Sequence, residues 1–134
     1  MTIRRFAFLL AALILISGLP GTFAARPAQA LTIIIVNDTG DSGTCINPTI
    51  TLRCAVQTAN GSADSTITIA FNVTGTIHIG SQLGLLSSTP KTIQISGNVT
   101  LDGGSSTQII GVASNINAVL QFLTIQHGNA TGTG

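Results

Sequence analysis

Hydrophobic residues recur with two different periods along this chain. In the segment 51–60 they follow helical spacing, with Leu52, Ala55, Val56 and Ala59 at i, i+3, i+4 and i+7. In the segment 66–71 the period is two, and isoleucine or phenylalanine alternates with threonine or alanine. The pattern predicts one short amphipathic helix that precedes an all-β body.

Local signals set the ends of the expected helix. Thr51 stands before the apolar stripe, where its hydroxyl can accept a hydrogen bond from a free N–H of the first turn. Asn60-Gly61 is expected to end the helix. Arg53 lies off the apolar stripe, and we expect it to make a structural hydrogen bond or an ion pair with an aspartate early in the β body.

Short β-branched runs continue to the end of the chain. They predict strands at 31–36, 75–79, 92–95, 99–101, 108–112 and 118–126, with a turn at Gly97-Asn98. The expected inward residues are Ile67, Ile69, Phe71, Ile77, Ile79, Ile93, Ile95, Val99, Leu101, Leu123 and Ile125, and the expected outward ones are Thr66, Thr68, His78, Gln94, Thr100 and Thr124. Stacked coils and a β-sandwich both bury such strands, and the period alone does not separate them.

Three phrases of the sequence match a known module. They are Thr51-Leu52-Arg53 with Ala55, Val56, Ala59 and Asn60; the stretch from Asp64 to Ile77; and Thr100-Leu101-Asp102-Gly103-Gly104. Together they resemble the CSLREAI domain, the N-terminal module of secreted right-handed parallel β-helix (pectin-lyase-like) proteins. The resemblance implies the first coils of such a β-helix, with the helix 51–60 capping the exposed sheet end. Two positions depart from the family pattern, because Ile50 replaces its Cys and Cys54 replaces its Glu.

Residues 1–30 have the features of a signal peptide. Arg4 and Arg5 precede an apolar run over 6–16, and Ala28-Gln29-Ala30 has the small-x-small form that signal peptidase accepts. Cleavage is expected between Ala30 and Leu31, with Ala24 or Ala25 as the competing last residue. The apolar run is shorter than the roughly 20 residues that span a bilayer. We therefore expect a secreted or cell-surface bacterial protein with no membrane span after cleavage.

Composition supports an exported β protein and excludes one class of partner. The chain has no Trp, Tyr or Glu, and it is rich in Thr and Ile, which suit a pleated sheet. After cleavage only Arg53 and Lys91 remain as cations, against Asp38, Asp41, Asp64 and Asp102. This balance gives no basic patch for nucleic acid.

Cys45 and Cys54 are the only cysteines. An oxidising destination favours a disulfide between them, and Asn47-Pro48 suggests a turn that brings them together. Two free thiols, a metal pair with other ligands, or bridges to a downstream segment remain as alternatives.

No constellation of residues predicts catalysis, cofactor binding or metal binding. Asp102-Gly103-Gly104 resembles a turn more than a calcium or catalytic site, because Asp caps its own backbone and Gly accepts a positive φ. Glycoside hydrolysis needs two carboxyl groups across one bond, and the aspartates are scattered. His78 and His127 have no second ligand at metal-like spacing.

Two functions remain. The first is a noncatalytic cap with the first coils, over 31–126, of a secreted or cell-surface, adhesin-like protein that binds an extracellular carbohydrate or protein. The alternative is the front of a pectin-lyase-like lyase or hydrolase whose catalytic coils lie beyond Gly134. Residues 127–134 are expected to form a flexible Gly/Thr/Asn tail of a truncated chain. This chain by itself is not expected to be an enzyme.

Overall fold

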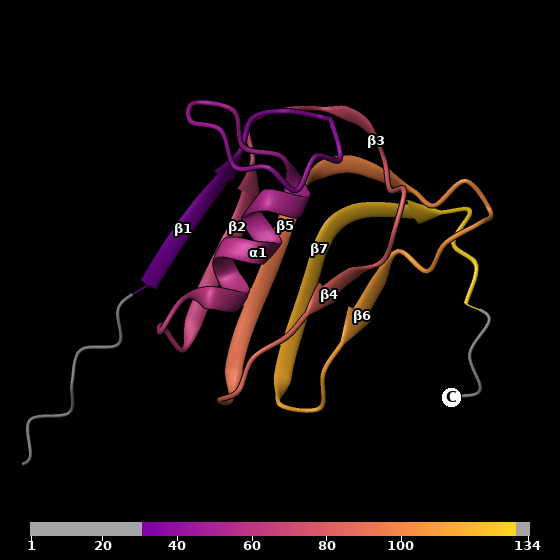
Figure 1. Ribbon diagram of the computed structural model, residues 1–134. Helices are drawn as coiled ribbons and strands as arrows, with labels where there is room; N and C mark the ends of the chain where they lie inside the picture. The colour runs from indigo at the N-terminus through magenta and orange to yellow at the C-terminus, as the bar shows by residue number, and fades with distance from the viewer. Residues whose placement is uncertain (1–30, 131–134) are drawn as a thin grey trace, which may run out of the picture.

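The computed structural model describes residues 31–130. The predicted leader over 1–30, its cleavage site and the tail residues 131–134 therefore lie outside the described residues or at their boundary. The elements are β1 (Leu31–Val36), α1 (Leu52–Gly61), β2 (Thr66–Phe71), β3 (Gly75–His78), β4 (Leu83–Leu85), β5 (Lys91–Asp102), β6 (Ile110–Val112) and β7 (Ile116–Gln126). In this part of the chain a single helix accompanies a body of strands (Figure 1), which confirms the all-β class.

The strands pair in parallel. The sheet order is β1-β2-β5-β7 along one side, while β3 pairs with the second half of β5 and β4 pairs with β6. The register places Ile67 beside Ile93 and Ile69 beside Ile95. Like residues thus stack on like residues, and an antiparallel sandwich is excluded for residues 31–130.

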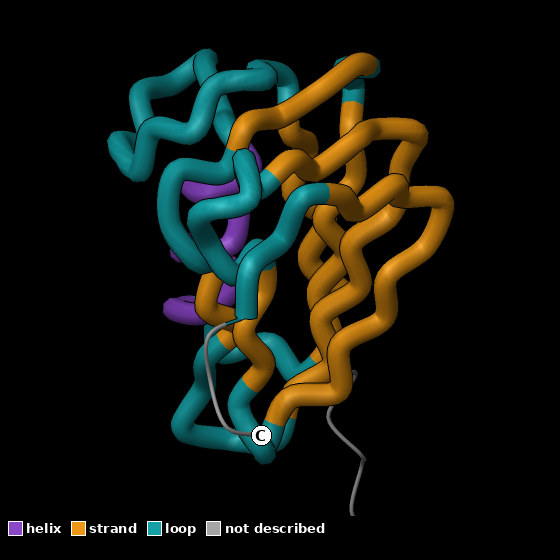
Figure 2. Tube along the Cα trace, turned by 90° about the vertical axis from the view of Figure 1, so that its right-hand side faces the viewer, coloured by secondary structure: helices purple, strands orange, loops and turns teal. Residues whose placement is uncertain are grey.

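Successive turns of the chain repeat the same path. β2, β3 and β4 follow one another, and the first half of β5, its second half and β6 then lie beside them in the same order. The two halves of β7 lie beside those of β5. Figure 2 shows the strands of successive turns stacked beside one another.

The expected turn at Gly97-Asn98 is wrong. β5 runs through it as one strand, and its pairing with β7 shifts register between Ser96 and Val99. Phe71 packs here, because a Cβ on Gly97 would lie 2.6 Å from Phe71 Cδ2. Glycine therefore lets the strand bend beneath an aromatic ring. The corresponding bend in β7 is at Phe122, with a φ of 56°.

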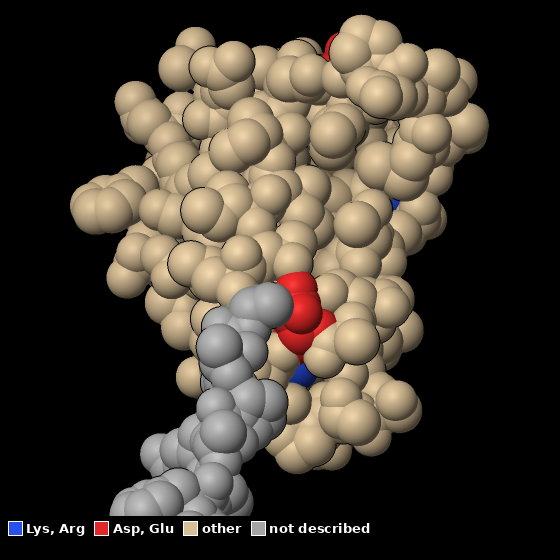
Figure 3. All heavy atoms as spheres, turned by 90° about the vertical axis from the view of Figure 1, so that its left-hand side faces the viewer, with Lys and Arg blue, Asp and Glu red and all other residues tan. Residues whose placement is uncertain are grey.

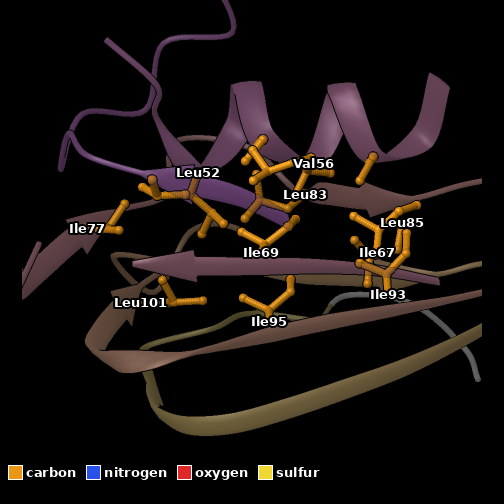
Figure 4. Close-up of a cluster of buried hydrophobic side chains, with 14 of the residues drawn as sticks. Leu52, Val56, Ile67, Ile69, Ile77, Leu83, Leu85, Ile93, Ile95 and Leu101 are labelled. Atoms are coloured by element: carbon orange, nitrogen blue, oxygen red, sulfur yellow. The ribbon is translucent and has the colours of Figure 1, made fainter. Parts of the chain in front are cut away.

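The core lies between α1 and the strands (Figure 4). The predicted helix stripe is confirmed, because Leu52, Ala55, Val56 and Ala59 are all buried. Burial of a Leu or Val side chain contributes roughly 1.5–3 kcal/mol. In Figure 4 Leu52 and Val56 project from the helix toward the strand residues below them.

Most of the predicted inward residues are buried. Ile67, Ile69, Ile77, Ile79, Ile93, Ile95, Val99 and Leu101 all belong to the core. Phe71 and Leu123 are only partly buried. Ile125 is 47% exposed, so its predicted burial is wrong. It lies in register with the buried Leu101, but no described strand lies on the far side of β7 to cover it.

Candidate functional site

A disulfide fixes the loop that precedes the helix. Cys45 and Cys54 are bonded, with their Cα atoms 5.3 Å apart. Cys54 is buried in the first turn of α1, whereas Cys45 lies in an exposed loop. The predicted local pairing is therefore confirmed over free thiols, a metal pair or downstream bridges.

The start of α1 is held by Thr51. Its Oγ1 accepts a hydrogen bond from the Cys54 backbone N–H at 3.2 Å, as predicted for a helix cap. The same hydroxyl donates to the Ser42 carbonyl at 2.5 Å. One side chain thus joins the loop to the helix.

Arg53 links three segments. Its Nη2 lies 2.8 Å from Asp41 Oδ2, and Nη2 also donates to the Ser81 carbonyl at 2.6 Å. Asp41 Oδ2 in turn accepts from the Gly80 N–H at 2.8 Å. The prediction of an ion pair is confirmed, but the partner precedes the helix, and Arg53 reaches the β body through a carbonyl. These contacts give Arg53 a structural role.

Lys91 and Asn60 hold the other end of α1. Lys91 is 4% exposed, and its Nζ donates to the carbonyls of Ala59 at 2.9 Å and Ser62 at 2.6 Å. A cation at a helix C-terminus is favourable, because the last carbonyls carry partial negative charge. Asn60 Nδ2 donates to the Gly84 carbonyl at 2.8 Å and its Oδ1 accepts from the Leu86 N–H at 2.9 Å. The sequence showed Lys91 only as an isolated cation.

A shallow hollow of about 550 Å³ lies where β2, β5 and β7 begin. We call it the polar groove, and its hydroxyl and amide side chains come from Ser65, Thr66, Thr92, Ser114, Asn115 and Asn117. The parallel register puts Thr66 beside Thr92 and Thr92 beside Asn117. The sequence predicted that Thr66 faces out, but only the register shows that these side chains form one row.

The chemistry of the polar groove is neutral. Lys91 also lines it, but its ammonium group is bound to the helix carbonyls. The Asn115 side chain donates to the Ser87 carbonyl, so part of its capacity is used within the protein. The remaining hydroxyls and amides can donate and accept hydrogen bonds, and thus suit an uncharged polar ligand.

Asp102 forms the predicted turn. Its Oδ1 accepts from the Gly104 N–H at 2.8 Å, and Gly104 has a φ of +58°. Gln126 Nε2 donates to Oδ2 at 3.0 Å, and His127 Nδ1 lies 3.1 Å from Oδ1. The Gly104 hydrogen bond, followed by those of Gln126 and His127, lowers the pKa of Asp102 to about 2. A carboxylate of this kind is poorly suited to act as a general acid.

The predicted histidine sites do not come together. His78 is exposed on β3, and His127 contacts Asp102. Within residues 31–130, no three His, Cys, Asp or Glu side chains are grouped so as to hold a metal ion. Asn129 N donates to the Thr107 carbonyl at 2.8 Å, so the chain continues to make backbone contacts beyond Gln126.

The outer surface beside β1 is almost free of charge (Figure 3). Leu31, Ile33 and Ile35 of β1 are 59%, 58% and 44% exposed. Their neighbours in register on β2 are Thr66, Thr68 and Ala70. The outer face therefore changes from apolar to hydroxyl side chains over one strand spacing.

Comparisons of the chain with protein-family models, curated proteins and solved structures give no match. The resemblance to the CSLREAI domain therefore stays a prediction that rests on the motifs. The helix found in the described residues is too short and too polar to cross a bilayer.

Proposed function

We propose that residues 31–126 are the helix-capped first coils of a right-handed parallel β-helix, and that the protein is a noncatalytic secreted or cell-surface, adhesin-like module. The observation that carries this proposal is the parallel register in which Ile67 stacks beside Ile93 and Ile77 beside Leu101, under the lid formed by α1. A stack of coils needs a lid of this kind, because a bare sheet end invites further pairing.

The disulfide supports export. A bond between Cys45 and Cys54 persists in an oxidising compartment, whereas the cytosol of most organisms keeps thiols reduced. The signal-like segment over 1–30 predicts the same route from the sequence.

The ligand class that fits the polar groove is a neutral carbohydrate. Thr66, Thr92 and Asn117 present hydroxyl and amide groups in one row across three strands. Sugar hydroxyls are both donors and acceptors and therefore match such a row. The two cations of the described chain, Arg53 and Lys91, are bound to internal partners, which leaves no basic surface for a polyanion.

Export is tested by fractionation and N-terminal sequencing of the protein from bacteria that express the full chain. We expect it outside the cytoplasm with Leu31 as its first residue. Retention in the cytoplasm with the leader attached would contradict export.

Carbohydrate binding is tested on the exported chain by calorimetry with a panel of neutral and acidic oligosaccharides. We expect binding of a neutral sugar, weakened about tenfold by Thr92→Val, which removes roughly 1.4 kcal/mol from one hydrogen-bonded contact. Thr100→Val, on the other half of β5, is the matched control and should bind as the parent does. Cleavage of the oligosaccharide during incubation would favour the enzyme alternative.

A further inference from the structure

The far side of β7 is an unpaired sheet edge within residues 31–130. β7 is 11 residues long and pairs with β5 only. Its backbone N–H and C=O groups on the other side are therefore open to a further strand. β1, the other outer strand of this sheet, has 6 residues.

Inward-facing side chains are exposed along this edge. Leu120 and Ile125 are 40% and 47% exposed, although their register partners Ile95 and Leu101 are fully buried. They line a hollow of about 410 Å³ together with Ile109, Ile110 and Val112. The hollow lies over β6, where the third turn of the chain adds no strand. This end of the core is therefore open.

The opposite end differs in shape and in chemistry. It is closed by α1, whose outer side carries the exposed Gln57 and Thr58. A polar helix face does not match an apolar hollow, so addition of the α1 end of one copy to the β7 end of another is unfavourable. The surface on the page that does match the β7 end is a second β7 end.

Charge does not oppose contact between two such ends. The segment 103–126 contains no charged residue. Edge strands that remain single in natural proteins are commonly protected by lysine, proline or a covering loop. β7 contains neither lysine nor proline.

We propose that two copies of this chain associate end to end through β7, with the two β7 strands paired antiparallel about a two-fold axis. An axis perpendicular to the β1-β2-β5-β7 sheet reverses the strand direction and exchanges the other two sides of the stack. The second half of β7 in one copy, 123–126, then lies over the hollow above β6 in its partner. Two identical edges satisfy each other in this arrangement, which is the commonest symmetry of homodimers.

The proposal rests on the β7 edge and not on the carbohydrate-binding function. It is tested with the purified, exported chain by sedimentation velocity over a range of concentrations. We expect a reversible monomer–dimer equilibrium, and hydrogen exchange at β7 amides that slows as concentration rises. A chain that stays monomeric at every concentration, or one that grows into open-ended fibres, would overturn the two-fold dimer.

Matched variants locate the contact. Leu120→Lys places like charges at the dimer contact, and we expect it to raise the dissociation constant at least tenfold. Gln94→Lys, on the outward face of the neighbouring β5, should leave the constant unchanged. Circular dichroism checks that both variants are folded, and equal association of the two would refute the assignment to β7. If neither variant folds, the concentration dependence of β7 exchange in the parent chain decides alone.

Discussion

Lys91 Nζ donates a hydrogen bond to the Ala59 carbonyl at 2.9 Å, and so connects the first residue of β5 to the last turn of the capping helix. The contact is buried, and it brings together residues 32 positions apart. The lid is thus fixed to the second turn of the chain as well as to the first.

Replacement of Lys91 by methionine tests this connection. Lys91→Met keeps the length of the side chain but leaves the Ala59 and Ser62 carbonyls without their donor. We expect a loss of roughly 1.5–3 kcal/mol in the free energy of unfolding, measured by urea denaturation. Gln94→Met, on the outer face of the same strand, is the control and should change stability by less than about 0.5 kcal/mol. Equal effects of the two variants would show that the Lys91 contacts do not hold the helix.

A charge beneath the helix should separate lid from body. Val56→Asp buries a carboxylate among apolar side chains, and we expect a loss of at least about 3 kcal/mol. Gln57→Asp puts the same group on the exposed side of α1 and should change the stability little. If chemical denaturation shows equal tolerance of both, α1 does not cover the core.

The disulfide should stabilise the loop and the first turn of α1. Cys45 and Cys54 close a loop with a sequence separation of 9. Loop-closure entropy predicts a loss of about 2.5–3 kcal/mol for the double variant Cys45→Ala, Cys54→Ala. Thermal unfolding with and without reductant checks the prediction, because reductant should destabilise the parent chain and leave the double variant unaffected. Sensitivity of the double variant to reductant would contradict it.

Acid should weaken the Asp102 turn over a defined pH range. Because the folded-state pKa of Asp102 is lowered from 3.8 to about 2, its contribution to stability is fully present well above pH 3.8. It is lost progressively as the pH falls toward and through about 2. Asp102→Asn should flatten the pH dependence of unfolding in this range relative to the parent. An NMR titration that places the Asp102 carboxyl near pH 3.8 would contradict this.

The bend in β5 should depend on the ring above it. A Cβ at Gly97 would lie 2.6 Å from Phe71 Cδ2, so we expect Gly97→Ala to cost about 1–3 kcal/mol through overpacking. The double variant Gly97→Ala, Phe71→Leu should lose less stability than the sum of the two single variants, because the smaller side chain makes room. A double-mutant cycle by denaturation measures this coupling, and strict additivity would show that the ring does not restrict the site.

The sequence by itself determined the helix, most of the strands and the side chains that face inward. Helical spacing from Leu52 to Ala59 and alternation around Ile67 and Ile69 depend on local geometry, because the period of a side-chain pattern follows from the backbone conformation. The Cys45–Cys54 pair was also within reach, since a short loop and an exported chain leave few other partners.

Only the tertiary structure decided the contacts made across turns of the chain. Lys91 appeared as an isolated cation until the fold brought it beneath the end of α1, and Asp41 was not foreseen as the partner of Arg53. Thr66, Thr92 and Asn117 form a row through the parallel register. Ile125 alternates like a core residue but is exposed, because burial requires a neighbour on both sides of a strand, and such neighbours come from chain that is distant in sequence.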